Sequence, residues 1–516
     1  MTPAGRALLL AVLTAAPALP AQERPSDEAL FDSASDAGAR APRTPLQTPA
    51  PDSRDEESLN APLGSSRNAF ETGRVKDNPL QVGGQFYLRG YTQATERTPP
   101  SKVQVSLPTL VDGFLDARPT ERLRAMVLAR MSYDPFLQAR PGSFASTAPL
   151  PANPSVALDQ AWLAFDIEHT LFVTAGRQHV KWGTGHIFNP TDFLSSSRRD
   201  PLALFDTRLG VSMVRASLPF ESVGANLTGV ALFEPTQLAG GLGTAGSSGS
   251  TGIAGVAAQS APTASNTNGA ALGSIGGAAR AEFALANVAF GVDGLVQRGR
   301  KSRAGVDVSA PLGPLDIYGE GLLIQGGDYD RVQRRSPPDP TRTTLGQIFY
   351  STQPNNPGHL TPQLVGGASY TTAFQDDKSV TVGAEYFYNA SGYTEASLYP
   401  GLILNGLYQP FYTGRNYAAV NATLVNPSAK TSYTVSNIGN LTDGSYISRF
   451  DFTVTALSYL TVEAFADYHY GHRGGEFRFA FEPSEAGLPP GSPNRLGIPT
   501  LQAPLFDVGF GIRLAM

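Results

Sequence analysis

The chain has 516 residues, a formal net charge of −5 and no cysteine. This near balance of charge gives no sign of the clustered basic surface that nucleic-acid binding needs, and without cysteine there are no disulfides and no thiolate zinc ligands. No stretch of eighteen consecutive apolar residues follows the N-terminal region, which excludes a protein that crosses a membrane with helices.

Residues 1–21 have the pattern of a cleaved secretory signal. Arg6 supplies a positive charge, and an apolar run of ten residues follows at 7–16. Small residues at Ala18 and Ala21 are suited to cleavage after either position. The run is too short to span ~30 Å of hydrocarbon, so we expect a signal peptide rather than a membrane anchor.

Residues 22–78 are rich in Pro, Ser, Asp, Glu, Ala and Arg, and few of them could build a core. This composition predicts a disordered periplasmic leader. The alternative interpretation is a tether that meets a periplasmic partner or the peptidoglycan layer.

From residue 79 to 516, alternating segments are joined by spacers whose lengths also alternate. Eight short spacers lie at 118–121, 168–170, 219–222, 286–287, 311–314, 375–378, 427–429 and 458–459. Nine other spacers, seven of them long, lie at 94–104, 135–155, 183–204, 235–277, 299–302, 327–362, 391–413, 440–445 and 483–502. Short turns at one end and long loops at the other are typical of transmembrane barrels. We therefore predict an all-β fold: an antiparallel up-and-down β-barrel of eighteen strands, with sixteen as the alternative.

The expected strands have one apolar face and one polar face. In 122–133, 380–389, 460–470 and 506–516, apolar residues occupy every second position and most charged residues lie between them. An arginine facing lipid near the bilayer centre costs about 2–4 kcal/mol, so the charged rows must face a water-filled interior. The basic residues predicted to line it are Arg89, Arg122, Arg124, Arg130, Arg177, His179, Lys181, Arg449 and Arg513. The acidic ones are Asp166, Asp293, Glu320, Glu385, Asp451, Glu463 and Asp467.

Three basic residues alternate near the end of one expected strand. Arg177, His179 and Lys181 would share one face of it. Such a ladder predicts a positive stripe for anionic groups, or else an ordinary wall in which carboxylates balance the charge.

The run GRQHVKWGTGHIFNPTDFL, residues 176–194, resembles a motif of porin-like outer-membrane β-barrel proteins of Gram-negative bacteria. In that motif a Gly-Arg-Gln strand end leads through Trp-Gly to an Asn-Pro-Thr-Asp turn. Residues 78–89 are similar to the first strand of such proteins. The resemblance implies an outer-membrane location, and passage of solutes or surface export. The even number of expected strands puts both termini on one side, which we expect to be periplasmic. Met516 departs from the family's usual aromatic end, although Phe506 and Phe510 keep aromatic residues nearby.

By the same resemblance, the third long loop should fold into the interior and narrow it; the alternative is a lid over the mouth. The residues expected to form this constriction are Trp182, Asn189, Pro190, Asp192, Arg198 and Arg199. The segment 235–279 carries no charge and is rich in Gly, Ala, Ser and Thr. It is interpreted as a flexible surface loop, or as one that enters the pore or engages a neighbour.

The sequence thus predicts a channel for polar or charged small solutes, without cofactor, metal or catalytic activity. The expected partners are outer-membrane lipid and lipopolysaccharide, the barrel-assembly machinery and a periplasmic protein bound through 22–78. The alternative is the barrel component of an envelope machine, such as a polysaccharide export conduit or a motility complex. A barrel enzyme or an adhesin is a more distant alternative.

Overall fold

The computed structural model describes residues 79–516 apart from 98, 100–102, 137–152, 196–197, 204–207, 234–274, 328–330, 340, 343–344, 354–357, 375–377, 406 and 482–501. The expected signal peptide and leader lie outside the described residues, as does nearly all of the uncharged segment 235–279.

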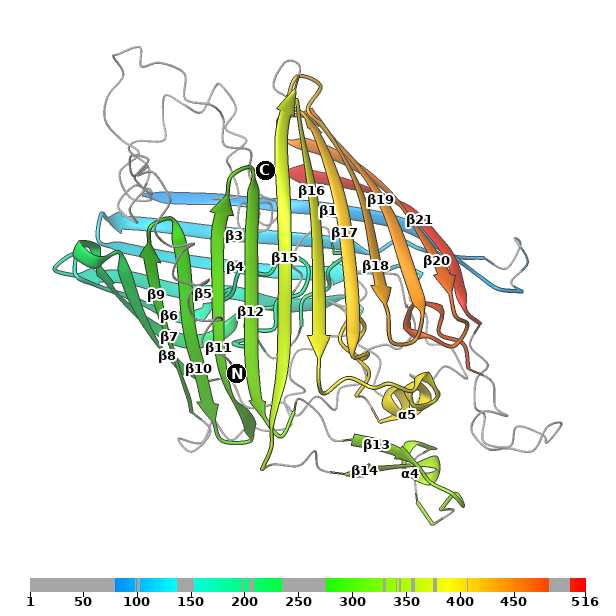
Figure 1. Cartoon of the computed structure of the whole chain (residues 1–516). Helices are drawn as coiled ribbons and strands as arrows, with labels where there is room; N and C mark the ends of the chain where they lie inside the picture. The colour runs from blue at the N-terminus through cyan, green and yellow to red at the C-terminus, as the bar shows by residue number, and fades with distance from the viewer. Residues whose placement is uncertain are drawn as a thin grey trace. The chain divides into compact units, whose positions relative to one another are not determined.

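Eighteen antiparallel strands in the described part of the chain form a closed ring (Figure 1). They are β1 (Leu80–Thr95), β3 (Thr109–Thr120), β4 (Leu123–Tyr133), β5 (Ser155–Ile167), β6 (Leu171–Gln178), β7 (Val211–Phe220), β8 (Ala225–Leu232), β9 (Gly276–Leu285), β10 (Val288–Gln297), β11 (Arg300–Leu312), β12 (Leu315–Gln325), β15 (Leu360–Phe374), β16 (Lys378–Asn389), β17 (Asn416–Asn426), β18 (Thr431–Asn440), β19 (Ser445–Leu457), β20 (Leu460–Gly471) and β21 (Pro504–Ala515). Each pairs with the next, so the expected up-and-down barrel of eighteen strands is confirmed and the alternative of sixteen is wrong.

The ring closes where β21 pairs with β1. Their register runs from Gln85 opposite Ala515 to Thr95 opposite Pro504. Beyond the ladder, the backbone groups of Gly84 and Met516 exchange two hydrogen bonds, of 3.0 and 2.8 Å. The atypical Met516 is therefore joined to the first strand by the same backbone pairing that holds the sheet.

The expected alternation of short and long connections is confirmed. We call the two ends of the barrel the turn end and the loop end. At the turn end, strands join through tight connections such as 168–170, 286–287 and 458–459. Two connections at the loop end are also brief, 298–299 and 441–444, as the spacing predicted.

Short elements occupy the connections at the loop end. They are β2 (Gln104–Ser106), the hairpin of β13 (Arg331–Arg334) and β14 (Tyr350–Gln353), the helices α4 (Leu345–Phe349) and α5 (Tyr399–Leu404), and the 3-10 helices η7 (Ala396–Leu398) and η8 (Glu476–Arg478). A further 3-10 helix, η5 (Glu221–Val223), lies at the turn end. No helix in the described ranges is both long and apolar enough to cross a bilayer.

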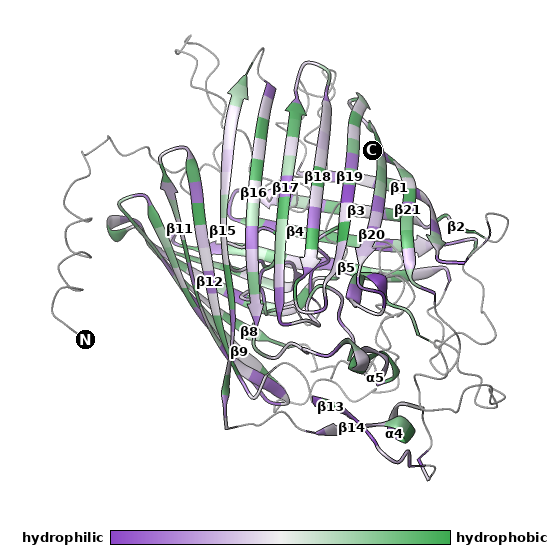
Figure 2. Ribbon diagram, turned by 45° about the vertical axis from the view of Figure 1, so that its right-hand side comes forward, coloured by the Kyte–Doolittle hydropathy of each residue, from purple (hydrophilic) through white to green (hydrophobic). Residues whose placement is uncertain are grey.

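Hydropathy alternates along the strands (Figure 2), and burial alternates with it as the sequence pattern predicts. In β4, Val127 and Met131 are 42% and 39% exposed, whereas Arg130 is 5% exposed. In β16 and β20 the rows that contain Glu385 and Asp467 are buried, while their apolar neighbours are exposed. The exposed row faces outward and the buried row faces the interior of the ring.

The inner wall differs in character along the barrel. Near the loop end it carries apolar residues, among them Met213, Leu232, Leu295, Leu322, Ile324, Phe387, Ile438 and Ile447. On β12 and β16 the charged inward residue lies one inward position farther from that end: Glu320 follows Leu322, and Glu385 follows Phe387. The expectation of an interior lined by charge is therefore corrected for β7 to β12 and for β15 to β19, where the wall near the loop end is apolar and a connection packs against it.

Candidate functional site

The connection between β6 and β7 enters the barrel. Its residues 182–195, which we call the folded-in segment, include four large apolar side chains that are almost fully buried: Trp182, Phe188, Phe193 and Leu194. Three of them pack against the apolar wall of β7 to β12, and Phe188 packs against that of β15 to β19. The rings of Phe188 and Phe387 stack with centroids 5.0 Å apart.

Glu320, on the inward row of β12, holds two parts of the folded-in segment. Its carboxylate accepts hydrogen bonds from the backbone N–H groups of Thr184, at 2.6 Å, and Gly185. It also accepts from the backbone N–H of Thr191, at 3.3 Å, and from its hydroxyl, at 2.9 Å. One buried carboxylate therefore satisfies four donors from two parts of the loop.

Glu385, on the inward row of β16, holds the next three residues in the same manner. It accepts from the backbone N–H groups of His186, Ile187 and Phe188 at 3.0, 3.2 and 2.5 Å. The hydroxyl of Tyr318 donates to the same carboxylate at 2.9 Å, and the imidazole of His186 stacks on the Tyr318 ring. Successive N–H groups turned toward one anion form a concave anion site. Here the protein's own carboxylates fill two such sites.

Local sequence explains why the segment can adopt this path. Gly183 has φ of +90°, and a Cβ there would lie 2.1 Å from the hydroxyl of Thr191. Asn189 donates from its amide to the carbonyl of Trp182 at 2.7 Å and accepts from the N–H of Asp192 at 2.9 Å. The Asn-Pro-Thr-Asp turn is thus closed by its own first residue.

Three arginines brace the folded-in segment and the residues just after it. Arg208 pairs with Asp192 at 2.8 Å. Arg300, at the start of β11, donates to the carbonyls of Phe193, Leu194 and Ser195. Arg198 donates to the carbonyl of Pro190 and to Gln363, and its guanidinium lies 5.2 Å from the centre of the Tyr412 ring. Arg199 is half-buried.

Three inward arginines each contact two carboxylates of the wall, which lie on the same strand or within two strands of it. Arg130 contacts Asp112 at 2.9 Å and Asp159 at 3.3 Å. Arg280 contacts both Asp293 and Asp307 at 2.7 Å. Arg449 contacts Asp451 at 2.9 Å and Asp467 at 3.2 Å. We call these groups the three arginine clusters. Because each guanidinium is paired within the wall, positive and negative groups are interleaved around the interior.

The other predicted wall residues divide between pairs and single contacts. Arg124 binds Asp116 at 3.0 Å, and Arg513 approaches Glu463 at 3.9 Å. Glu463 also accepts from the hydroxyl of Tyr87 at 3.1 Å. The buried Arg89 lies 4.2 Å from the centre of the Phe465 ring. Asp166 is on the inward row of β5, near the turn end.

The predicted basic ladder is wrong. Strand β6 ends at Gln178, so His179 and Lys181 do not continue a strand face. Arg177 pairs with Ala161 and Ser212, and this register does not place it on the inward row. His179 is held at 2.8 Å by the carboxylate of Asp159. The backbone φ of +127° at Gly176 interrupts the regular alternation just before these residues.

Arg122 was also expected on the wall, and this prediction is wrong. It lies in the turn between β3 and β4, its side chain is 57% exposed, and it reaches Asp166 only at 4.0 Å. The Arg122 side chain lies at the turn end of the barrel, because β4 begins one residue later, at Leu123.

Sequence reasoning missed four members of the arginine clusters: Asp112, Asp159, Arg280 and Asp307. Strand alternation could have indicated three of them. Asp112 alternates with outward Val111 and Gly113. Arg280 lies between two alanines, and Asp307 lies between two valines. Asp159 could not be found this way, because a register shift in β5 turns both Asp159 and Gln160 inward.

A buried carboxyl outside the strands was also missed. Glu476 in η8 is 1% exposed. It accepts from the backbone N–H of Phe411, the hydroxyl of Tyr417 and, at 2.7 Å, the amide of Asn440. Burial, and then the nearby charge of Asp443, raise the pKa of Glu476 to about 8. This group ties the connections at the loop end to β17 and β18.

Within the described residues, no group of three or more His, Asp or Glu side chains is arranged to hold a metal ion. No protein-family model matches the chain, and no curated protein matches it either, so the resemblance of residues 176–194 to a family motif stays a prediction.

The chain is similar to solved structures of barrel proteins. OccAB1 of Acinetobacter baumannii aligns over 85% of this chain and 97% of its own, with 10% identity and a TM-score of 0.48. A triple mutant of the porin from Rhodopseudomonas blastica aligns over 85% and 100%, with 9% identity and a TM-score of 0.37. Another variant of that porin gives 8% identity and a TM-score of 0.38 over the same shares.

Proposed function

We propose that the chain is a porin-like channel of the outer membrane through which small polar solutes pass. The outward rows of the barrel support a membrane location. Val292, Val306, Leu323, Leu364 and Val420 on these rows are 44–54% exposed. A continuous apolar surface around the ring is unfavourable in contact with water and favourable in contact with lipid.

The observation that carries the proposed channel is the attachment of the folded-in segment. Glu320 and Glu385 together accept seven hydrogen bonds from it. A loop held in this way inside a closed ring reduces the free cross-section at one fixed level. We infer that solutes pass between the segment and the facing strands.

The three arginine clusters support modest rather than strong ion selectivity. Each places one positive group in contact with two negative ones on the interior wall. A passing ion therefore meets both signs at short range, which orients dipolar solutes without excluding either charge.

Ion conductance in a planar bilayer tests this function. The full chain, purified and reconstituted, should produce discrete conductance steps, with a cation-to-anion permeability ratio that stays within a few-fold of one. Liposome swelling with neutral sugars of increasing mass should then give an upper size limit. A reconstituted, folded barrel that produced neither conductance nor swelling would refute the channel.

A further inference from the structure

Residues 472–481, which we call the η8 segment, follow β20 and contact β19, β20 and β21 at the loop end. Phe477 of this segment is buried, and its ring lies 5.3 Å from that of Phe411. The next ring along that connection, Tyr412, lies 6.1 Å from Phe188 of the folded-in segment. The η8 segment therefore supports, through these aromatic contacts, the loop that narrows the interior.

A buried histidine of β20 joins the η8 segment to β21. The Nδ1 atom of His469 lies 2.8 Å from the backbone carbonyl oxygen of Phe477. A carbonyl oxygen can only accept, so Nδ1 carries a proton. Nε2 lies 3.6 Å from one oxygen of Asp507 on β21, and within the described residues neither Nε2 nor the second oxygen of that carboxylate has a hydrogen-bond partner. A neutral imidazole sets the lone pair of Nε2 against the carboxylate, whereas a protonated imidazole can donate to it.

The groups around His469 carry more negative than positive charge. Those that the structure describes are three carboxylates of β19, β20 and β21, a guanidinium of β19 and an amide of β1: Asp451, Asp467, Asp507, Arg449 and Gln93. The two arginines of the η8 segment, Arg473 and Arg478, pair instead with Glu96. A cation at His469 would therefore reduce the excess of negative charge.

A second proton is needed where the η8 segment meets β18. Glu476 and Asp443 both accept from the amide of Asn440, at 2.7 and 3.0 Å, so two carboxyls converge on one donor group. Neither of them forms an ion pair with a described residue. The titratable groups that face this pair are three tyrosine hydroxyls: Tyr399, Tyr408 and Tyr417. With the pKa of Glu476 at about 8 through burial and then the charge of Asp443, the pair holds one proton below this pH.

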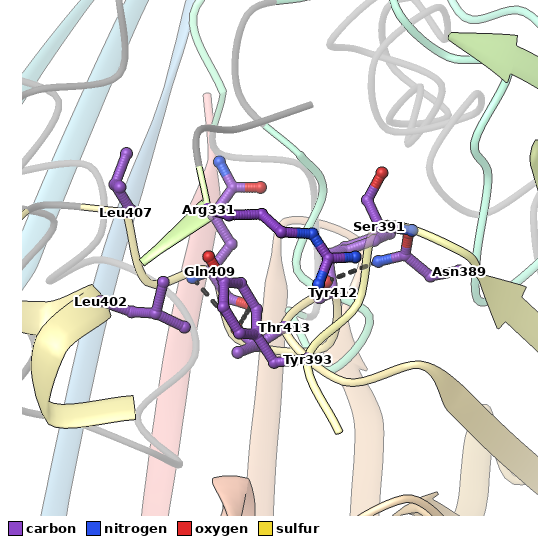
Figure 3. Close-up of a pocket in the computed structure, with 9 residues that line it drawn as sticks. All are labelled: Arg331, Asn389, Ser391, Tyr393, Leu402, Leu407, Gln409, Tyr412 and Thr413. Atoms are coloured by element: carbon purple, nitrogen blue, oxygen red, sulfur yellow. Dashed lines mark hydrogen bonds between the residues drawn. The ribbon is translucent and has the colours of Figure 1, made fainter. Parts of the chain in front are cut away.

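The same carboxyl holds an unusual turn of the connection that leads to β17. Phe411 has φ of +68°, which a residue with a side chain rarely adopts, and its backbone N–H donates to Glu476. The N–H of Gln409 donates to the hydroxyl of Thr413 at 3.3 Å and closes the turn, which lines a small cavity (Figure 3). Glu476 thus helps to fix a conformation that the chain does not favour by itself.

We propose that the η8 segment is a latch operated by protons. With a charged His469 and one proton on the pair of Asp443 and Glu476, the segment is bound to β18, β20 and β21 and supports the folded-in segment. Loss of these protons sets a lone pair against Asp507 and adds a second buried negative charge, so the η8 segment leaves its position and the narrowed level widens. The inference rests on the proposed channel and adds a means of control, because the passage opens as the pH rises.

Hydrogen exchange of the full chain in detergent, followed by mass spectrometry, tests the latch without requiring conduction. After correction for the intrinsic effect of pH on exchange, the amides of residues 472–481 should be about tenfold less protected at about pH 9 than at about pH 6. Planar-bilayer recording should show a higher mean conductance at the higher pH.

Two substitutions should each remove part of this dependence on pH. In Asp507→Asn the new amide can donate to a neutral imidazole, and in Glu476→Gln the buried charge cannot form. Each should keep the η8 segment more protected at high pH than in the wild type, and the double variant should keep it fully protected. His472→Gln is the matched control, since His472 is exposed on the same segment, and it should behave as the wild type does. Electrophoretic mobility with and without heating establishes that each variant is a folded barrel.

Three results would overturn the latch. They are equal protection of residues 472–481 at both pH values in the wild type, an unchanged dependence on pH in both single variants, and loss of that dependence in His472→Gln. A barrel that conducts while its η8 segment does not respond to pH refutes only this inference. A barrel whose η8 segment responds to pH but which passes no current refutes only the channel.

Discussion

Removing the carboxylate of Glu320 should loosen the folded-in segment. In Glu320→Ala, three backbone N–H groups and one hydroxyl lose their acceptor. Each unsatisfied donor costs about 1–3 kcal/mol, although water that enters the space left by the side chain recovers part of this. We expect a net loss of about 3 kcal/mol from the packed position, which changes the ratio of packed to released segment by about a hundredfold.

Single-channel recording measures this change directly. When the folded-in segment leaves its packed position, the pore is wider, so the mean conductance should rise. Because the segment leaves and returns, the current should also become noisier. Asp316→Asn is the matched control, because Asp316 lies on the same strand but is exposed near the turn end. Its conductance and noise should equal those of the wild type. If Glu320→Ala also matched the wild type in both, the idea that this carboxylate fixes the narrowing would be wrong.

Three further predictions concern pH, backbone conformation and the lipid face. The pKa of Glu476 is about 8 in the folded protein and near 4.5 in the unfolded chain. The packing of the connections at the loop end is therefore most stable at low pH, and its stability falls by about 4–5 kcal/mol as the pH rises from 4.5 to 8. In Glu476→Gln, the melting temperature should no longer depend on pH in this range. Gly183→Ala should disturb the folded-in segment, since the new Cβ would meet Thr191 at 2.1 Å in an unfavourable φ, and conductance noise should rise while the melting temperature of the barrel stays constant. Val292→Arg, on the outward row of β10, should destabilise the barrel in lipid by about 2–4 kcal/mol, measured by urea titration in vesicles; no loss there would contradict the assignment of that row to lipid.

The fold was predictable from sequence because the alternation of apolar and polar residues within each strand shows which residues lie on which face of the barrel wall. The turn at 286–287, for example, is a local signal, and the alternation around Arg130 or Asp467 needs no knowledge of distant residues. Register between neighbours then follows from keeping the apolar rows on one side.

The folded-in segment was predictable only in part. Glu320 and Glu385 were expected to face inward, but their partners lie 136 and 199 residues away in the chain. Nothing in the local pattern says that a carboxylate will meet backbone N–H groups rather than an arginine. The failed ladder has a related cause: regular alternation was extended past Gly176, where the backbone leaves the strand conformation.

The pairing of β1 with β21 also bears on how the molecule assembles. Until those two strands meet, the sheet has two open margins, each with unpaired backbone groups that any other extended chain could capture. Every other ladder of the described barrel joins strands that follow one another around the ring. This seam is therefore the strand pairing between the parts of the chain that are farthest apart in sequence, and such contacts form slowly. Substitutions that weaken the seam should therefore slow insertion and promote aggregation before they alter the finished barrel.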